Sequence, residues 1–219
     1  MLLLNGLLDI IIEAFGDIIL SHSNYPKAWG RFISSSRNED NVMPKELSDF
    51  AQLSRWSARF RLAKSFEALD LGDHYFGSNT LGLYSAITRI FLVYSAFETY
   101  CRILGLNPRY ESQVKVLQDS QLQKDVIKSI RELDPKNSFS GFLCEHLSGS
   151  DLKKMMSEFT SGQDVNISFL ARCTRHIFAH GVLTANSPNL SAKRSDQVSQ
   201  LISDFLLTSM DQDFENRVP

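Results

Sequence analysis

The 219-residue sequence predicts an all-α fold. Apolar residues recur at helical spacing over long segments, no stretch has the alternation of a convincing strand, and the Gly and Pro residues fall between the periodic segments. The apolar fraction of 43% and the charged fraction of 22% are those of an ordinary globular protein. The chain is long enough for one well-packed domain.

Residues 1–20 predict an amphipathic helix. Asn5, Asp9, Glu13 and Asp17 recur every four residues, so polar groups form one stripe and apolar residues the opposite face. Three acids are costly in a membrane span, and the segment lacks the basic start and cleavage site of a signal peptide. We therefore expect no membrane contact, and we expect this helix to pack on the body or on a second subunit.

The rest of the chain predicts a helical bundle. We divide the sequence into an N-terminal helix and linker at 1–43 and a helical domain at 44–219, which together form one compact unit. Pro44 suits a first helical turn, Gly105 and Pro108 end the apolar helix at 81–104, and Asn166 or Ser168 caps the helix that begins around Ile167. We expect further helices at 44–69, 81–104, 113–133, 139–147, 150–160, 167–180 and 195–214.

Charge and cysteine usage narrow the functional classes. The net charge of −2 creates no global positive field, so contact with RNA needs a local basic patch or two patches joined by oligomerisation. The three cysteines, Cys101, Cys144 and Cys173, have no paired spacing and lie in apolar segments. Such a set is typical of buried, reduced thiols in a cytoplasmic protein.

The strongest functional signal is the segment from Arg175 to Gly181, Arg-His-Ile-Phe-Ala-His-Gly, at the end of a predicted helix. RNA is cleaved when its 2′-OH attacks the adjacent phosphate, which requires two proton transfers and stabilisation of added negative charge. Histidine suits the proton transfers and arginine the charge. Arg175 and His180 lie about 140° apart around a helix, so they flank one broad face.

This segment resembles the motif of the HEPN superfamily (higher eukaryotes and prokaryotes nucleotide-binding domain). Arg175 matches the motif Arg, His176 the polar residue after it and His180 the motif His. The resemblance follows the helix order over roughly 44–219, and only 175–181 carries motif-level similarity. It implies an HEPN-like helical bundle, catalytic roles for these three residues, and no metal or other cofactor.

The resemblance also implies partners. Members commonly form homodimers that bring two motifs together as a metal-independent endoribonuclease, and many are toxins, phage-defence effectors or RNA-processing enzymes. RNA, a second copy of the chain, and an antitoxin or regulatory protein are therefore the expected partners. Toxins paired with nucleotidyltransferase antitoxins often carry a Tyr after the motif His, whereas Gly181-Val182-Leu183 follows here. This departure speaks against that particular pairing.

Four alternatives to the ribonuclease stay open, one of them a purely structural dimerisation bundle with the N-terminal amphipathic helix as its interface. The basic residues near this helix end, among them Arg172 and Arg175, stabilise a helix dipole without any further role. His176 and His180 have the spacing of two zinc ligands, but no third ligand accompanies them. A further alternative is a non-catalytic helical module that binds RNA, nucleotide or a protein partner through the same cleft.

Two further groups are candidates for supporting roles. We expect Glu98 and Arg172 beside the motif, with Glu98 orienting Arg175; an ordinary Glu98–Arg102 pair within one helix is the commoner explanation.

Arg55, Trp56 and Arg59 form a basic stretch with an aromatic ring that suits RNA. A solvated helix edge with Trp56 in the core is the interpretation that general burial tendencies favour.

Overall fold

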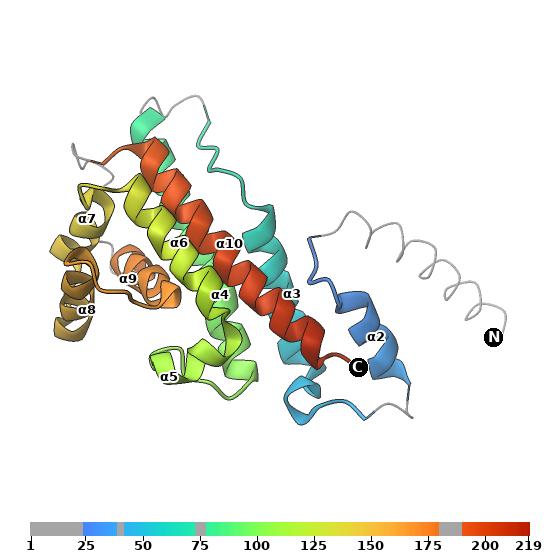
Figure 1. The fold of residues 1–219 in the computed structure, drawn as a ribbon. Coiled ribbons are helices and arrows are strands. Elements are labelled where there is room, and N and C mark those ends of the chain that lie inside the picture. The colour runs from blue at the N-terminus through green and yellow to red at the C-terminus, as the bar shows by residue number, and fades with distance from the viewer. Residues whose placement is uncertain (1–23, 39–41, 73–77, 180–189) are drawn as a thin grey trace.

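The structure is a computed structural model that describes residues 24–38, 42–72, 78–179 and 190–219. These residues form helices and no strand (Figure 1), so the all-α prediction is confirmed. The predicted helix at 1–20 lies outside the described residues. The α-helices are α2 (Trp29–Arg37), α3 (Phe50–Ser65), α4 (Ser78–Ile103), α5 (Glu111–Val114), α6 (Ser120–Leu133), α7 (Ser138–His146), α8 (Ser150–Thr160), α9 (Ile167–Ala179) and α10 (Ala192–Arg217).

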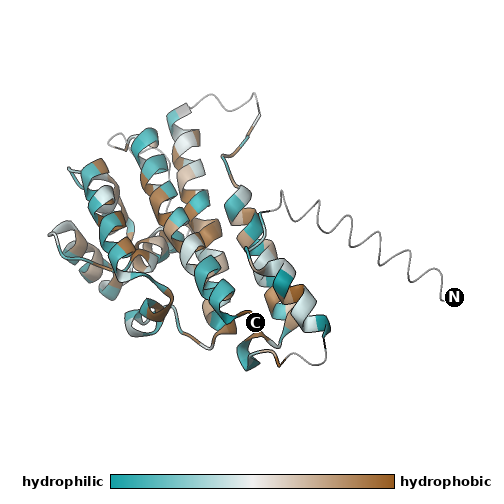
Figure 2. Ribbon diagram, turned by 45° about the vertical axis from the view of Figure 1, so that its right-hand side comes forward, coloured by the Kyte–Doolittle hydropathy of each residue, from teal (hydrophilic) through white to brown (hydrophobic). Residues whose placement is uncertain are grey.

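The long helices α4 and α10 lie side by side at the centre of the bundle (Figure 1). Helices α3 and α9 pack on α4, and α6 packs on α10. Each helix carries both apolar and polar residues (Figure 2), and the buried apolar residues of all of them form one core. By length and composition, residues Asn79–Ile103 of α4 are also apolar enough to cross a membrane. In this structure α3, α9 and α10 pack on α4, as expected of the central helix of a bundle.

Helices α4 and α10 approach closely near their N-termini. A Cβ atom built on Gly82 of α4 would lie 2.8 Å from the Cβ of Ala192 in α10. Real Cβ contacts are essentially never that short, so the absence of a side chain at Gly82 permits this crossing.

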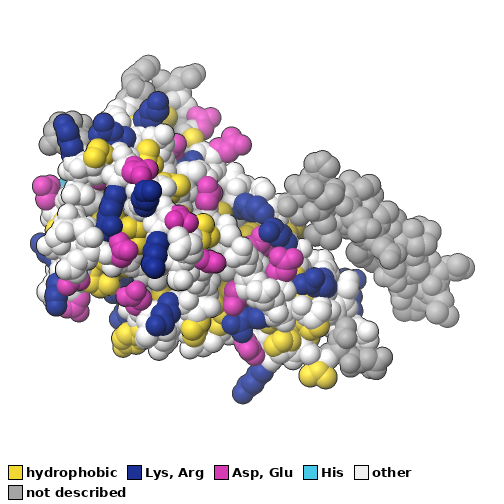
Figure 3. Space-filling view, viewed as in Figure 1, with side chains coloured by type: hydrophobic (Ala, Val, Ile, Leu, Met, Phe, Trp, Pro, Cys, Tyr) yellow, Lys and Arg dark blue, Asp and Glu magenta, His cyan; other side chains and the backbone are white. Residues whose placement is uncertain are grey.

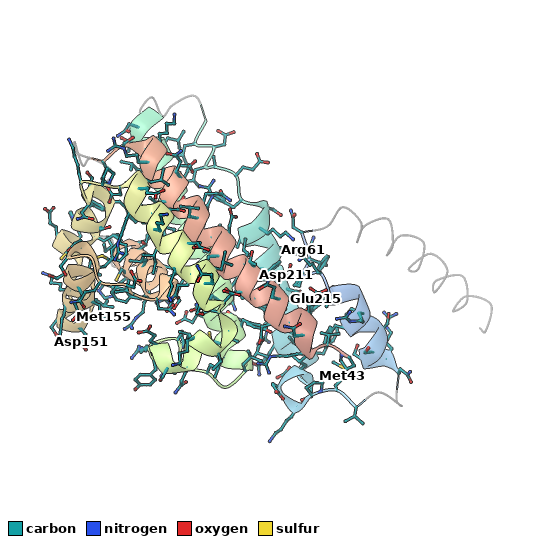
Figure 4. The ribbon with its side chains drawn as sticks, in the orientation of Figure 1. Met43, Arg61, Asp151, Met155, Asp211 and Glu215 are labelled. Atoms are coloured by element: carbon teal, nitrogen blue, oxygen red, sulfur yellow. The ribbon has the colours of Figure 1, made fainter. Side chains whose placement is uncertain are left out.

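Helix α2 was not predicted, because its segment is polar and Ser-rich. Trp29 and Phe32 are buried against Phe214 of α10, with ring centroids 6.1 Å and 5.7 Å from that of Phe214. The backbone N–H of Lys27 donates to Asp211 and Arg31 donates to the Glu215 carbonyl, both on α10 (Figure 4). The described part of the predicted linker therefore belongs to the same core as the helical domain.

Two predicted helices begin later than expected because an aspartate caps each of them. Asp49 accepts a hydrogen bond from the Gln52 N–H, so the helix expected from residue 44 begins at Phe50. Asp119 accepts from the N–H groups of Gln121 and Leu122, and this cap separates α6 from the short helices at 111–117. The expected cap at Asn166 is confirmed, since its Oδ1 accepts from the Ser168 N–H in the first turn of α9.

Candidate functional site

The packing of α9 on α4 brings the motif helix to a second set of polar residues. Arg172, Arg175 and His176 come from α9, and residues one helical turn apart, Glu98 and Arg102, come from α4. The structure thus places Glu98 and Arg172 beside Arg175, as expected. His180 lies outside the described residues, so its predicted role remains a prediction.

Arg175 is held in place while its head remains accessible. Its Nη2 lies 3.3 Å from Oε2 of Glu98, and its Cζ lies 5.9 Å from the centre of the Tyr94 ring. The side chains of Arg175 and Glu98 are 40% and 30% exposed. In the described part of the chain Glu98 pairs with Arg175 across the helices and forms no ion pair with Arg102. A guanidinium group positioned in this way has donors left for an anion.

His176 contacts the segment that follows α7. Its Nε2 lies 2.9 Å from Oγ of Ser148, a hydrogen bond that fixes one side of the ring. The ring also lines the same pocket as Arg175. His176 is therefore oriented beside the motif arginine, which suits the auxiliary contact expected of it.

The ring of Tyr94 lies beneath the guanidinium group of Arg175. Its side chain is almost completely buried. Burial raises the pKa of Tyr94, and the nearby Glu98 carboxylate raises it further. The phenol therefore stays neutral at physiological pH and supplies no competing base at this site.

A pocket of about 470 Å³ opens between α4, α9 and the segment between α4 and α5. Glu98 is the one acid among the described residues that line it, against four arginines. Since the net charge of the chain is −2, this excess is local; on the face that Figure 3 shows, Lys and Arg are interspersed with Asp and Glu. The pocket is lined by Tyr94, Glu98, Arg102, Gly105, Leu106, Asn107, Pro108, Arg109, Arg172, Arg175 and His176.

The loop that carries Arg109 is built by specific backbone contacts. Gly105 has a φ of 69° and ends α4, with the Leu106 N–H donating to the Cys101 carbonyl and the Gly105 N–H to the Arg102 carbonyl. The Asn107 side chain then accepts from the Arg109 N–H at 3.0 Å. These bonds hold the loop against the end of α4, so that Arg102 and Arg109 line one pocket.

Arg102 and Arg109 were missed as site residues in the sequence. In the sequence, Arg102 stands out only as a partner for Glu98, and the Gly and Pro residues near Arg109 only as a helix end. The available signal was two arginines seven residues apart on either side of a helix stop. The two arginines become part of a site only because α9 packs beside them.

The predicted RNA-binding stretch on α3 requires a correction. Trp56 is fully buried, with its Nε1 3.5 Å from Sδ of Met210, so it cannot stack on a base. The alternative interpretation, a core tryptophan, is confirmed. Arg55 is exposed, and Arg59 donates to Oγ1 of Thr99 at 2.8 Å. Neither arginine lines the pocket at Arg175.

The described residues contain no group of three His, Cys, Asp or Glu that is arranged to hold a metal ion. Comparisons of the chain with protein-family models, with curated proteins and with solved structures found no significant match.

Proposed function

We propose that this protein is a metal-independent endoribonuclease of the HEPN type. The observation that carries the proposal is the position of Arg175, which is anchored by Glu98 at the wall of an arginine-rich pocket and still has free donors. His180 follows one residue after the end of α9. The histidine that the chemistry requires is thus the next residue in the chain after the helix that carries the arginine.

Cleavage would proceed by attack of the RNA 2′ oxygen on the adjacent phosphorus. A base, His180 in one subunit, takes the 2′ proton while the bond to the 5′ oxygen breaks and that oxygen takes a proton from an acid. The guanidinium group of Arg175 stabilises the negative charge that develops on the phosphate oxygens. His176 contributes an auxiliary contact. The products are a 2′,3′-cyclic phosphate and a 5′-hydroxyl end.

A second copy of the chain would complete the site. One His cannot act as base and acid in the same step, whereas a two-fold pair of α9 helices supplies two His180 and two Arg175 side chains. The proposed active species is therefore a homodimer with the two motifs facing one another.

The test is incubation of the purified protein with labelled RNA in EDTA, followed by analysis of the product ends. The wild type is expected to release 2′,3′-cyclic phosphate ends, and His180→Ala and Arg175→Ala are expected to release none. His146→Gln is the control, because His146 lies on α7, contacts the Phe142 carbonyl and does not line the pocket. A strict requirement for added divalent metal, or full activity in His180→Ala, would refute the mechanism.

Absence of cleavage by a folded, dimeric wild-type protein would favour the other candidate, a helical module that binds RNA or a nucleotide without cleaving it. Three of the four pocket arginines form no ion pair with the described residues, which suits binding without cleavage. A filter-binding assay with 2′-O-methyl RNA, which cannot be cleaved by this route, separates the two functions.

A further inference from the structure

The pocket carries more positive charge than its own residues neutralise. Arg102, Arg109 and Arg172 form no ion pair in the part of the chain that the structure describes, and Glu98 already pairs with Arg175. These side chains come from three separate places: the end of α4, the loop that follows it and the middle of α9. Like charges that converge in a pocket repel one another, so a bound anion would stabilise the arrangement.

We propose that this pocket binds a ligand with clustered phosphate groups, a di- or triphosphate, through Arg102, Arg109 and Arg172 together with Arg175. A volume of about 470 Å³ lies within the range of small-molecule sites, about 300–1,000 Å³. It has room for one nucleotide-sized group. The ligand therefore brings its charges in a compact form.

The chemistry of the lining selects phosphate clusters over single phosphodiesters. Each guanidinium group presents a planar fork that matches two phosphate oxygens. A phosphodiester inside a strand carries one negative charge, which leaves most of these arginines unneutralised. A triphosphate carries several charges within a few bond lengths, which matches arginines that converge from three elements.

The lining also indicates that the nucleobase of a bound nucleotide contributes little to its affinity. Among the described lining residues the apolar contacts come from Leu106 and Pro108, and the aromatic ring of Tyr94 is buried beneath Arg175. Among the described lining residues the remaining ring is the small imidazole of His176, which already forms a hydrogen bond with Ser148. Recognition through phosphates predicts similar affinity for adenine and guanine nucleotides.

This binding goes beyond the proposed function and does not require cleavage, because His180 takes no part in it. The two are linked only through Arg175. A phosphate cluster bound there excludes an RNA phosphate from the same guanidinium, so a ribonuclease with this pocket is competitively inhibited by tripolyphosphate.

Calorimetric titration in EDTA with inorganic tripolyphosphate and with orthophosphate tests the proposal. Tripolyphosphate is expected to bind one site per chain at least about tenfold more tightly than orthophosphate. The double variant Arg102→Gln/Arg109→Gln is expected to weaken tripolyphosphate binding by about tenfold or more. Thermal melting of each variant checks that it remains folded, as expected for two exposed side chains.

Arg37→Gln is the matched control, since Arg37 is exposed at the end of α2, a helix that contributes no residue to the pocket and lies on the opposite side of the bundle from α9 in Figure 1. Its affinity for tripolyphosphate is expected to equal that of the wild type. Equal binding of both phosphates, or equal loss in the Arg37 variant, would refute a specific site. His180→Ala is expected to bind normally, so failure of the ribonuclease proposal leaves this result unaffected.

Two sources of the phosphate cluster are distinguished by three further ligands: ATP, a 2′-O-methyl RNA with a 5′-triphosphate, and the same RNA with a 5′-hydroxyl. Tighter binding of the 5′-triphosphate RNA than of ATP would assign the pocket to the end of a strand. Equal binding of the two would assign it to a free nucleotide. Binding of the 5′-hydroxyl RNA as tightly as the triphosphate RNA would contradict the proposal, because internal phosphodiesters would then suffice.

Discussion

Arg175 of α9 and Glu98 of α4 form an ion pair across two helices, with Nη2 and Oε2 3.3 Å apart at the wall of the pocket. Both side chains are partly exposed, so solvent screens the pair and its contribution to stability is small, about 0–1 kcal/mol. Its consequence is geometric: the carboxylate restricts where the guanidinium points. Glu98 is therefore a positioning residue for Arg175.

Glu98→Gln is expected to lower kcat for RNA cleavage by about tenfold while the melting temperature changes little. The amide keeps an acceptor but loses the charge that holds the guanidinium. KM is expected to stay constant or to fall, because a negative charge leaves a pocket that binds an anion. Steady-state kinetics and thermal melting measure the two effects.

Glu132→Gln is the control for the Glu98 variant. Glu132 is an exposed residue of α6 that pairs with Lys128 at 3.9 Å, and it does not line the pocket. An equal loss of kcat in both variants would contradict a positioning role for Glu98.

Asp134→Ala is expected to lower the free energy of unfolding by about 2 kcal/mol. Asp134 is buried, and its carboxylate accepts hydrogen bonds from the backbone N–H groups of Ser138, Phe139 and Ser140 in the first turn of α7. Removing it leaves buried donors unpaired. Urea denaturation of Asp134→Ala and Asp134→Asn measures the effect, and the Asn variant, which keeps one acceptor oxygen, is expected to lose less. Equal stability of all three proteins would show that water replaces the carboxylate.

The helical class and the central helix were predictable because they depend on local periodicity. The apolar run around 81–104 has to be buried on most of its faces, and the corresponding helix α4 is buried in this way. Helix α2 was not predictable in the same way, because Trp29 and Phe32 are stabilised by burial against Phe214, some 180 residues later in the chain. Tertiary packing overrides a weak local preference there.

The same distinction applies to the site. Arg175 and His176 were identified because the motif is contiguous, and Glu98 because it lies on the inner helix that the motif helix was expected to face. Arg102 and Arg109 were not identified as site residues, because their approach to Arg172 depends on how α9 packs on α4 and on the turn at Gly105. Trp56 was considered for RNA binding from composition, and packing placed it in the core.

Gly82→Ala is expected to destabilise the protein by about 1–3 kcal/mol through overpacking, less the gain of up to about 1 kcal/mol in helix propensity. The added methyl group would lie 2.8 Å from Cβ of Ala192 unless α4 and α10 move apart. Removing the opposing methyl group in the double variant Gly82→Ala/Ala192→Gly is expected to relieve the clash. Urea denaturation of the two single variants and the double variant gives the coupling. Additive effects would contradict the close approach of these helices.

Alkaline pH is expected to destabilise the protein through its buried thiols and phenols. Burial raises the pKa of Cys101 from 9.0 to about 12, and it also raises the pKa of Cys173. The pKa of Tyr100 is raised mainly by burial and further by Asp213, whose carboxylate accepts a hydrogen bond from the phenol. In each case the unfolded chain loses its proton at lower pH than the folded chain.

The contribution of these groups to the free energy of unfolding should therefore be constant below about pH 8 and fall as pH rises from 9 towards 12, the interval over which Cys101 is ionised only in the unfolded state. Urea denaturation at several pH values measures this slope. Cys101→Ala removes one such group, so its stability is expected to fall less steeply with pH than that of the wild type. Val116→Ala is the control, because Val116 is exposed and carries no titratable group, so its removal should leave the slope unchanged. Identical slopes in the wild type and both variants would show that Cys101 does not contribute to the alkaline transition, and that the buried tyrosines or Cys173 account for it.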